Sequence, residues 1–358
     1  MTMDLSTVSP YSVKQKEKES LLLKELNALT DHHRRQCPAY DKLMKIMYPN
    51  YKTAKNLSEI PYLPIGLFKT ERLMSIPESA IFRILTSSGT AGQRVSQVIL
   101  DRPTAERQTK ALAKIMTSIL GPDRRPMIII DSEEVLAHAD MLNARYAAIL
   151  GMMNFGRDHF FALNENRDLK IDELKAYLEK HKGRPILLYG FTFMIWRYFI
   201  QRLKDGEINI PDGTLIHVGG WKKLHEEQVT NERFKELLHN KSGVQHVHNF
   251  YGMVEQTGSV FLEGTDGYLY PPAFADVIVR DPITWQECPT GQVGVLQVIS
   301  TLPTSYPGHS LLTEDLGIVH GVDDSQCLWQ GKRFSVVGRV PKVELRGCSD
   351  VYAYQGRQ

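Results

Sequence analysis

The sequence predicts an α/β protein in which mostly parallel sheets are covered by helices, with a smaller β-rich lobe near the C-terminus. Between residues 103 and 250, short apolar runs alternate with amphipathic segments, which favours parallel strands joined by helices. From about Gly264 the apolar runs follow one another without helical segments between them. The 358 residues, 42% hydrophobic and 23% charged, are enough for a large core and two or three subdomains.

Residues 1–80 are predicted to form a helical and irregular lead-in. The segment Tyr11–Gln36 has helical periodicity, carried by Leu21, Leu22, Leu26 and Leu29. The cluster His32–Arg35 is interpreted as a solvated helix end. Proline and aromatic residues make Ile60–Ser79 ordered but irregular, and its Phe68-Lys69 pair could be either a pocket wall or a structural contact.

Residues 81–263 are predicted to form the α/β core. The expected helices span Pro103–Leu120, Asn143–Leu150, Leu169–Lys182, Thr192–Leu203 and Glu226–His239. The expected strands span Met127–Asp131, Pro185–Tyr189, Thr214–Val218 and Val244–Phe250. One apolar stretch, which could line an acyl or aryl pocket, is interpreted as a buried helix: Phe191, Phe193, Met194, Trp196 and Phe199.

Residues 264–358 are predicted to form the β-rich lobe and a C-terminal tail. Its expected strands span Ala275–Arg280, Gln292–Ser300, Leu316–His320, Phe334–Val337 and Lys342–Leu345.

Charge and composition exclude several functions. A net charge of +2, from 43 basic and 41 acidic side chains, gives no field that favours nucleic acid or an anionic membrane. The N-terminus lacks the apolar core of a signal peptide, and no apolar run is long enough to span a bilayer. These features predict a cytoplasmic protein without a membrane span.

The cysteines and histidines give no metal-site spacing. The four cysteines are scattered without a CxxC pair, so neither disulfides nor zinc are expected. Cys37, Cys288 and Cys327 are interpreted as small buried hydrophobes. His246 and His248 alternate on an expected strand, but no third ligand follows at a familiar spacing, so we interpret them as pocket or core histidines.

The stretch Leu85–Leu100, reading LTSSGTAGQRVSQVIL, is the candidate phosphate loop. Within the seven positions 86–92 this stretch has four hydroxyl residues and two glycines, and Arg94 follows. Glycines allow tight turns that point backbone N–H groups inward, and hydroxyls add donors, so such a loop can wrap a phosphate. An ordinary polar turn between two strands is the alternative. It is not a Walker loop, because no Gly-Lys-Ser/Thr ending is present.

Three further candidate positions follow expected strands, where ligands gather in parallel α/β sheets. Gly219 and Gly220 would let a flat ring approach the backbone. Tyr251 could stack on a base, and the carboxylate of Glu255 could hold Mg²⁺. Asp315, expected in a turn, could accept hydrogen bonds from ribose hydroxyls. Each motif alone is also common turn chemistry.

In order, the Ser/Thr/Gly loop, YGMVE, TEDLG and GRVPKVELRG resemble the core motifs of the adenylate-forming superfamily, which includes acyl-CoA ligases and luciferase-like enzymes. A narrower set resembles the LuxE family of acyl-protein synthetases: PYLPIGLFKTERL, SSGTAG, HVGGWK, TEDLGIV and the C-terminal RGCS. In that family a fatty acid is activated as acyl-AMP and passed to a cysteine near the C-terminus, and then to a partner reductase. The matching cysteine is Cys348.

The resemblance implies a fold like the N-terminal domain of adenylate-forming enzymes, with ATP and Mg²⁺ as cofactors. It implies that the phosphates of ATP lie on Ser87, Ser88, Gly89, Thr90 and Gly92. It further implies that Gly219 and Gly220 border the adenine and that Tyr251 stacks on it. Glu255 would assist Mg²⁺, Asp315 would take the ribose hydroxyls, and Arg339 would help at the ribose or phosphate.

Two departures from the superfamily pattern stand out. The phosphate loop of the superfamily usually ends in Pro-Lys, whereas here the basic residue is Arg94, one position earlier. The sequence ends at Gln358, so we expect the small C-terminal domain, with its catalytic lysine, to be absent. Lys222 and Lys342 are possible substitutes for that lysine.

The leading hypothesis is an ATP-dependent acyl-protein synthetase. A carboxylic acid of the fatty-acid class and ATP would give acyl-AMP, and the thiolate of Cys348 would then take the acyl group as a thioester for hand-off to a protein partner such as an acyl reductase. One alternative keeps the adenylation step but uses coenzyme A, a carrier protein or an alcohol as direct acceptor. Another is a nucleotide-binding scaffold without catalysis.

Overall fold

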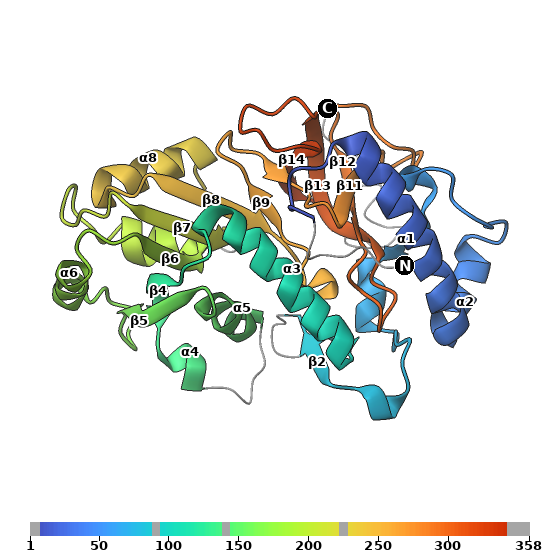
Figure 1. The fold of residues 1–358 in the computed structure, drawn as a ribbon, viewed down its shortest axis with the longest axis horizontal. Helices are drawn as coiled ribbons and strands as arrows, with labels where there is room; N and C mark the ends of the chain where they lie inside the picture. Colours follow the sequence, from blue (N-terminus) through green and yellow to red (C-terminus); the bar gives the residue numbers. More distant parts are fainter. Residues whose placement is uncertain (1–7, 88–93, 138–143, 222–227, 342–358) are drawn as a thin grey trace, which may run out of the picture.

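The computed structural model describes residues 8–87, 94–137, 144–221 and 228–341. Within them, most strands join one large mixed sheet in the order β11-β12-β13-β14-β10-β9-β8-β7-β6-β4-β5, and β2 and β3 form a separate two-stranded sheet. Parallel strands with their helices fill one half of the molecule, and antiparallel strands with the N-terminal helices fill the other (Figure 1).

The parallel half confirms the predicted alternation of strands and helices. Its strands are β4 (Arg125–Ser132), β5 (Gly156–Leu163), β6 (Ile186–Phe191), β7 (Gly213–Val218) and β8 (His246–Tyr251), all paired in parallel. Its helices are α3 (Arg102–Leu120), α4 (Glu134–Ala137), α5 (Ala144–Met153), α6 (Ile171–Lys180) and α8 (Asn231–Ser242). Strand β5 was not predicted, because it begins with the polar run Arg157–His159 and shows no clear apolar pattern there.

Antiparallel pairing extends the same sheet beyond β8. The strands are β9 (Phe261–Glu263), β10 (Leu269–Tyr270), β11 (Ala275–Arg280), β12 (Gly294–Ser300), β13 (Ser310–Val322) and β14 (Lys332–Arg339). The change from parallel to antiparallel pairing falls close to residue 264, where the sequence becomes β-rich. The division into three domains stays a prediction.

The N-terminal region packs on the antiparallel half. It contains α1 (Gln15–Gln36), α2 (Pro38–Met47), the short 3₁₀ helices η1 (Leu57–Glu59), η2 (Ile65–Lys69) and η3 (Glu78–Ala80), and β1 (Leu63–Pro64), which pairs in parallel with β13. Leu22 and Leu26 of α1 share a buried cluster with Ile278 of β11 and Ile299 of β12. The face predicted from leucine spacing therefore meets the sheet through Leu22 and Leu26, whereas Leu21, predicted to lie on the same face, is 41% exposed.

One prediction about α1 is wrong. The cluster His32–Arg35 is not uniformly solvated, because His33 is completely buried. Its Nδ1 lies 2.8 Å from the Ser75 hydroxyl, and its Nε2 lies 3.3 Å from the carbonyl oxygen of Pro303. The segment that connects β12 to β13 folds over this part of the helix, and helical spacing alone gives no sign of that contact.

The expected helix over Thr192–Leu203 is shorter and irregular. It comprises α7 (Thr192–Ile195) and a π-helical turn, η4 (Trp196–Ile200). Met194, Trp196 and Phe199 are buried, and Trp196 and Phe199 belong to the core of the parallel half, which agrees with the interpretation as core. Phe191 and Phe193 are half-buried.

The described residues contain no helix long and apolar enough to cross a membrane. In the same residues, no group of three or more His, Cys, Asp or Glu side chains could hold a metal ion. Cys37, Cys288 and Cys327 are free thiols; Cys37 is buried as predicted, and the other two are only partly buried. His248 is buried with Nδ1 2.8 Å from the carbonyl oxygen of Glu263, and His246 is exposed.

Candidate functional site

The stretch Leu85–Leu100 is an antiparallel hairpin whose connecting loop is the candidate phosphate loop. Strands β2 (Arg83–Thr86) and β3 (Gln97–Leu100) pair along their length. Beyond them, Ser87 N–H donates to the Ser96 carbonyl at 3.1 Å, and Ser96 N–H donates to the Ser87 hydroxyl at 2.9 Å. Ser87 therefore closes the hairpin where the loop begins. Ser88, Gly89, Thr90 and Gly92 lie outside the described residues.

Asp315 joins two of the other predicted residues. The Tyr251 hydroxyl donates to Asp315 Oδ2 at 2.7 Å, and Arg339 Nε lies 3.3 Å from Asp315 Oδ1. Asp315 and Arg339 are also register partners of β13 and β14. The prediction that Asp315 sits in a turn is wrong, because the residue lies inside β13. The β13–β14 register shifts just after Leu316, and this irregularity carries the polar TEDLG segment within a long strand.

Tyr251 is packed so that its hydroxyl stays a hydrogen-bond donor. Its ring lies 6.0 Å from that of Phe261 in a stacked arrangement, and edge-on to Phe334 at 6.5 Å. Burial raises the pKa of Tyr251 well above its ordinary value, and the negative charge of Asp315 acts in the same direction. The phenol therefore remains protonated and holds the Asp315 carboxylate in place.

Gly219 and Gly220 lie at the same sheet edge as Tyr251. Val218 pairs with Phe250 in the parallel β7–β8 register, so Gly219 and Tyr251 follow at equivalent positions. Gly219 has φ of +79°, a conformation that favours glycine, and the Thr192 hydroxyl fixes its carbonyl at 2.5 Å. Apart from its two chain neighbours, no described residue has an atom within 4 Å of where a Cβ on Gly220 would stand. The backbone here is open to a flat ligand.

Glu255 is a buried carboxylate at the turn after β8. It lies in the 3₁₀ turn η6 (Val254–Gln256) and is only 5% exposed. Burial raises the pKa of Glu255, and the negative charge of Glu314 adds to this effect, whereas the Ser96 hydroxyl and the Lys69 ammonium oppose it. Strand β3 of the hairpin also contacts η6, so the hairpin lies against the turn that carries Glu255.

A cavity of 560 Å³ lies between η2 and the start of β3. Phe68, Lys69, Arg72, Arg94 and Gln97 are among the residues that line it. Arg72 is paired with Glu78 at 2.7 Å, whereas no ion pair joins Lys69 or Arg94 to another described residue. Lys69 and Arg94 thus offer positive charge to an anion in this cavity.

The structure brings two predicted groups together and leaves others undescribed. Tyr251, Asp315 and Arg339 form one group, and Glu255 lies in the turn that follows Tyr251. Cys348 lies outside the described residues, as do the candidate lysines Lys222 and Lys342.

Ser96 and Glu314 were not predicted as site residues, because a serine or a glutamate beside a motif has no distinctive sequence pattern. A pocket wall was only one of two options for the Phe68-Lys69 pair, and the cavity favours that one.

Comparison with solved structures gives the class of the fold. The open conformation of 2-hydroxyisobutyryl-CoA ligase in complex with 2-HIB-AMP and CoA superposes with a TM-score of 0.69 at 17% identity, covering 96% of this chain and 83% of that chain. The same ligase in its thioesterification state gives 0.69 at 16% identity over 95% and 74%. The fold is that of adenylate-forming ligases, as predicted.

A family model described as "Acyl-protein synthetase, LuxE" matches residues 3–355, so the chain belongs to the LuxE family. It is 23% identical over 304 residues to a long-chain-fatty-acid–luciferin-component ligase of Vibrio harveyi and 23% identical over 299 residues to one of Aliivibrio fischeri. These alignments cover 83% and 82% of this chain and 78% of each relative. The chain is therefore an AMP-forming ligase of the acyl-protein synthetase type, which activates a carboxylic acid with ATP.

Proposed function

We propose that this chain converts a fatty acid to its acyl-AMP beside Asp315 and Glu255, and passes the acyl group to Cys348 for transfer to a partner protein such as an acyl reductase. The observation that carries the proposal is the adjacency of two groups. Asp315 is held by Tyr251 and Arg339, and Tyr251 ends β8 only four residues before the buried carboxylate of Glu255. A ribose site and a metal-phosphate site can therefore lie side by side.

In this proposal, the nucleotide lies across the carboxyl ends of β7 and β8. Asp315 accepts hydrogen bonds from the ribose hydroxyls, for which a fixed carboxylate is suited. Gly219 and Gly220 border the adenine, Tyr251 offers it an aromatic ring, and Arg339 assists at the ribose or phosphate. The loop from Ser87 to Gly92 takes the phosphates, and the hairpin bonds of Ser87 and Ser96 support its start.

The residues present fit Mg²⁺ better than a metal held only by protein. Mg²⁺ is usually bound by one or two carboxylates together with substrate phosphates. Glu255 supplies one buried carboxylate, and the described residues contain no cluster of three or more ligands that would form a closed protein cage. When bound, Mg²⁺ neutralises phosphate charge and orients the phosphates.

Adenylation needs positive charge and orientation. A carboxylate oxygen of the acid attacks the α-phosphorus of ATP, the bond to the bridging oxygen breaks, and pyrophosphate leaves. Negative charge accumulates on the phosphate oxygens as this happens, and positioned cations lower the barrier. In this proposal Lys69 and Arg94, which border the cavity next to the hairpin, supply this positive charge together with Arg339.

The second step transfers the acyl group to sulfur. The Cys348 thiol loses its proton to solvent, the thiolate attacks the acyl carbon, and the bond from that carbon to the AMP oxygen breaks. The products are a thioester and AMP. Transfer from this thioester to an acceptor on the partner regenerates the thiol.

The test separates the two steps. We expect pyrophosphate exchange into ATP that depends on a fatty acid, and labelled acyl group retained on the denatured protein and released by hydroxylamine. Cys348→Ser should abolish labelling and keep exchange. Cys288→Ser, which removes another free thiol, is the matched control and should keep both.

Three outcomes would contradict parts of this proposal. Labelling that survives in Cys348→Ser would exclude the covalent step at this cysteine. Formation of acyl-coenzyme A without labelled protein would support direct transfer to coenzyme A instead. ATP binding without exchange over a broad panel of acids would favour a non-catalytic scaffold.

A further inference from the structure

We infer that Tyr306, a residue of the connection between β12 and β13, is a positioning residue for Glu255 and hence for binding of ATP with Mg²⁺. The inference rests on the role proposed above for Glu255. The Tyr306 hydroxyl contacts the backbone of Glu255 and not its carboxylate, so Tyr306 would act on the metal ligand indirectly.

The hydroxyl of Tyr306 forms a hydrogen bond with the turn that carries Glu255. The ring is fully buried, and its hydroxyl donates to the backbone carbonyl of Glu255 at 2.9 Å. Gln108 of α3, also buried, donates its Nε2 to the same hydroxyl at 3.3 Å. The Tyr306 hydroxyl thus accepts a hydrogen bond from Gln108 and donates one to Glu255. The donated hydrogen bond fixes the backbone carbonyl of Glu255, the residue proposed to hold the metal.

The turn that carries Glu255 needs outside support. Its η6 helix is only three residues long, and no side chain caps its start. Gln256 Nε2 donates to the Gly308 carbonyl at 2.8 Å, so the same β12–β13 connection holds the turn at two successive residues. A Cβ on Gly308 would lie 2.2 Å from the Tyr306 ring and 2.8 Å from the Glu255 carbonyl oxygen. The close approach therefore requires glycine at 308.

Tyr306 also reaches the other segments that border Glu255. Its ring meets that of Phe68 edge-on at 6.1 Å, and Phe68 immediately precedes Lys69. The neighbouring Ser305 hydroxyl donates to the Ile99 carbonyl of β3 at 2.9 Å. One short segment, Ser305–Gly308, thus ties the carboxylate turn to the hairpin and to the lysine-bearing η2. Burial raises the pKa of Tyr306, so the hydroxyl stays a donor throughout the usual pH range.

The test compares Tyr306→Phe with Tyr177→Phe. Tyr177 is a matched control because its hydroxyl also donates to a backbone carbonyl, that of Asp158 at 2.7 Å, in the parallel half. Calorimetry without any fatty acid would measure the Kd of ATP with Mg²⁺ and with EDTA. We expect Tyr306→Phe to weaken binding about tenfold with Mg²⁺, as loss of one well-placed hydrogen bond allows, and to leave binding in EDTA unchanged. Tyr177→Phe should alter neither constant.

Two further variants make the result decisive. Glu255→Gln should lose the same Mg²⁺-dependent affinity, and adding Tyr306→Phe to it should cause no further loss. Gln108→Met, which removes the donor to the Tyr306 hydroxyl, should give a smaller loss of the same kind and replaces Tyr306→Phe if that variant does not melt cooperatively.

The inference would be overturned if Tyr306→Phe bound ATP with Mg²⁺ as the wild type does while losing as much thermal stability as Tyr177→Phe. It would also be overturned if the losses in Glu255→Gln and Tyr306→Phe added fully. In either case the wild type would still catalyse pyrophosphate exchange, and the proposed function would be unaffected. Absence of exchange and of ATP binding in the wild type would instead contradict the proposed function, and the inference with it.

Discussion

Glu255 acquires its chemical character from its neighbours. Burial and the negative charge of Glu314 raise the pKa of Glu255 above that of an ordinary glutamate, whereas Ser96 and Lys69 oppose this increase. Proton loss is therefore displaced to higher pH than for an ordinary glutamate. Only the ionised form is a good ligand for Mg²⁺, so this displacement has a measurable consequence.

We predict that fatty-acid-dependent pyrophosphate exchange, measured at limiting Mg²⁺, becomes slower as pH is lowered. The raised pKa of Glu255 should set the position of this acidic limb of the pH profile. Glu314→Gln should move this limb to lower pH, because it removes a negative charge that raises the pKa of Glu255. The pH profile of exchange measures both. A limb that keeps its position in Glu314→Gln and persists in Glu255→Gln would show that another group is responsible.

Asp315 and Tyr251 can each be identified from the sequence, but the hydrogen bond between them cannot. The YGMVE and TEDLG segments mark both residues in the sequence, but their mutual hydrogen bond spans 64 positions of chain. It depends on β13 and β14 lying next to the β9–β10 pair, an order that is not the order of the sequence. Local patterns therefore identify the residues and leave their contact undetermined.

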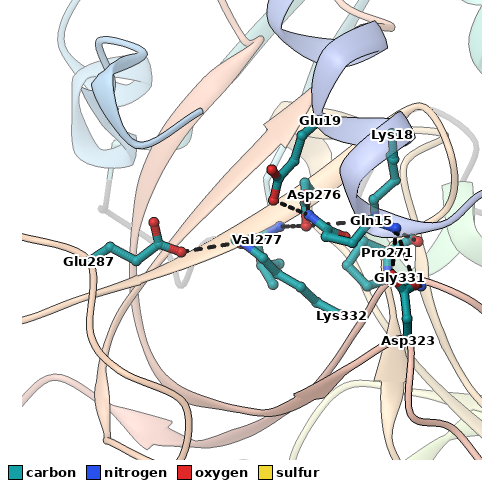
Figure 2. Close-up of polar contacts among 10 residues, drawn as sticks. All are labelled: Gln15, Lys18, Glu19, Pro271, Asp276, Val277, Glu287, Asp323, Gly331 and Lys332. Atoms are coloured by element: carbon teal, nitrogen blue, oxygen red, sulfur yellow. Dashed lines mark hydrogen bonds and ion pairs between the residues drawn. The ribbon is translucent and has the colours of Figure 1, made fainter. Parts of the chain in front are cut away.

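At the scale of elements, α1 is fastened to the antiparallel sheet by buried charges (Figure 2). Lys18 of α1 lies 3.7 Å from Asp276 of β11, and Gln15 donates to the same carboxylate at 2.6 Å. Lys332 of β14 donates to the Val277 carbonyl at 2.9 Å and pairs with Glu287 at 3.3 Å. Although burial works to raise it, Lys18 and Lys332 hold the pKa of Asp276 below its ordinary value.

We predict that Asp276→Ala lowers the free energy of unfolding by about 3–5 kcal/mol, because it leaves the ammonium of Lys18 buried without its carboxylate. Asp324→Ala is the control. Its pair with Arg333 is far more exposed, so its loss should cost about 1 kcal/mol or less. Urea unfolding of both variants measures the difference. Equal losses would mean that the buried ion pair does not fasten α1.

Helices and strands could be predicted from the sequence where the apolar periodicity is local and regular. The strands β4, β6, β7 and β8 and the helices α3 and α6 follow from apolar spacing, since each buries one face or both faces against its neighbours. The prediction failed at β5, at the shortened α7 and at Asp315 within β13. There a polar opening, a π-helical turn and a shifted register depend on what packs alongside.

For the molecule as a whole, buried histidines link stability to pH. Burial lowers the pKa of His217 and His309 to about 3, and burial together with His309 and His32 lowers that of His33 well below 6.5. In the unfolded chain these groups titrate near 6.5. Below that pH the unfolded state binds more protons than the folded state, so stability is full above about 6.5 and falls as pH drops.

We predict that the free energy of unfolding decreases between about pH 6.5 and 4, with each buried histidine contributing up to about 1.4 kcal/mol per pH unit. Urea unfolding at several pH values measures the slope. His309→Gln should reduce the slope, whereas His246→Gln, at an exposed position, should leave it unchanged. An unaltered slope in His309→Gln would assign the acid sensitivity to other groups.

The sequence by itself determined the α/β class, the position of the glycine- and hydroxyl-rich loop, the candidate nucleotide residues and the family resemblance. These are properties of local pattern and of motif order, which survive without knowledge of contacts. Only the tertiary structure decided that His33 is buried, that Lys69 borders a cavity, that Glu255 is withdrawn from water, and that Tyr306 holds its turn. The physical reason is that burial and long-range hydrogen bonds depend on which strands become neighbours, and spacing along the chain does not specify that order.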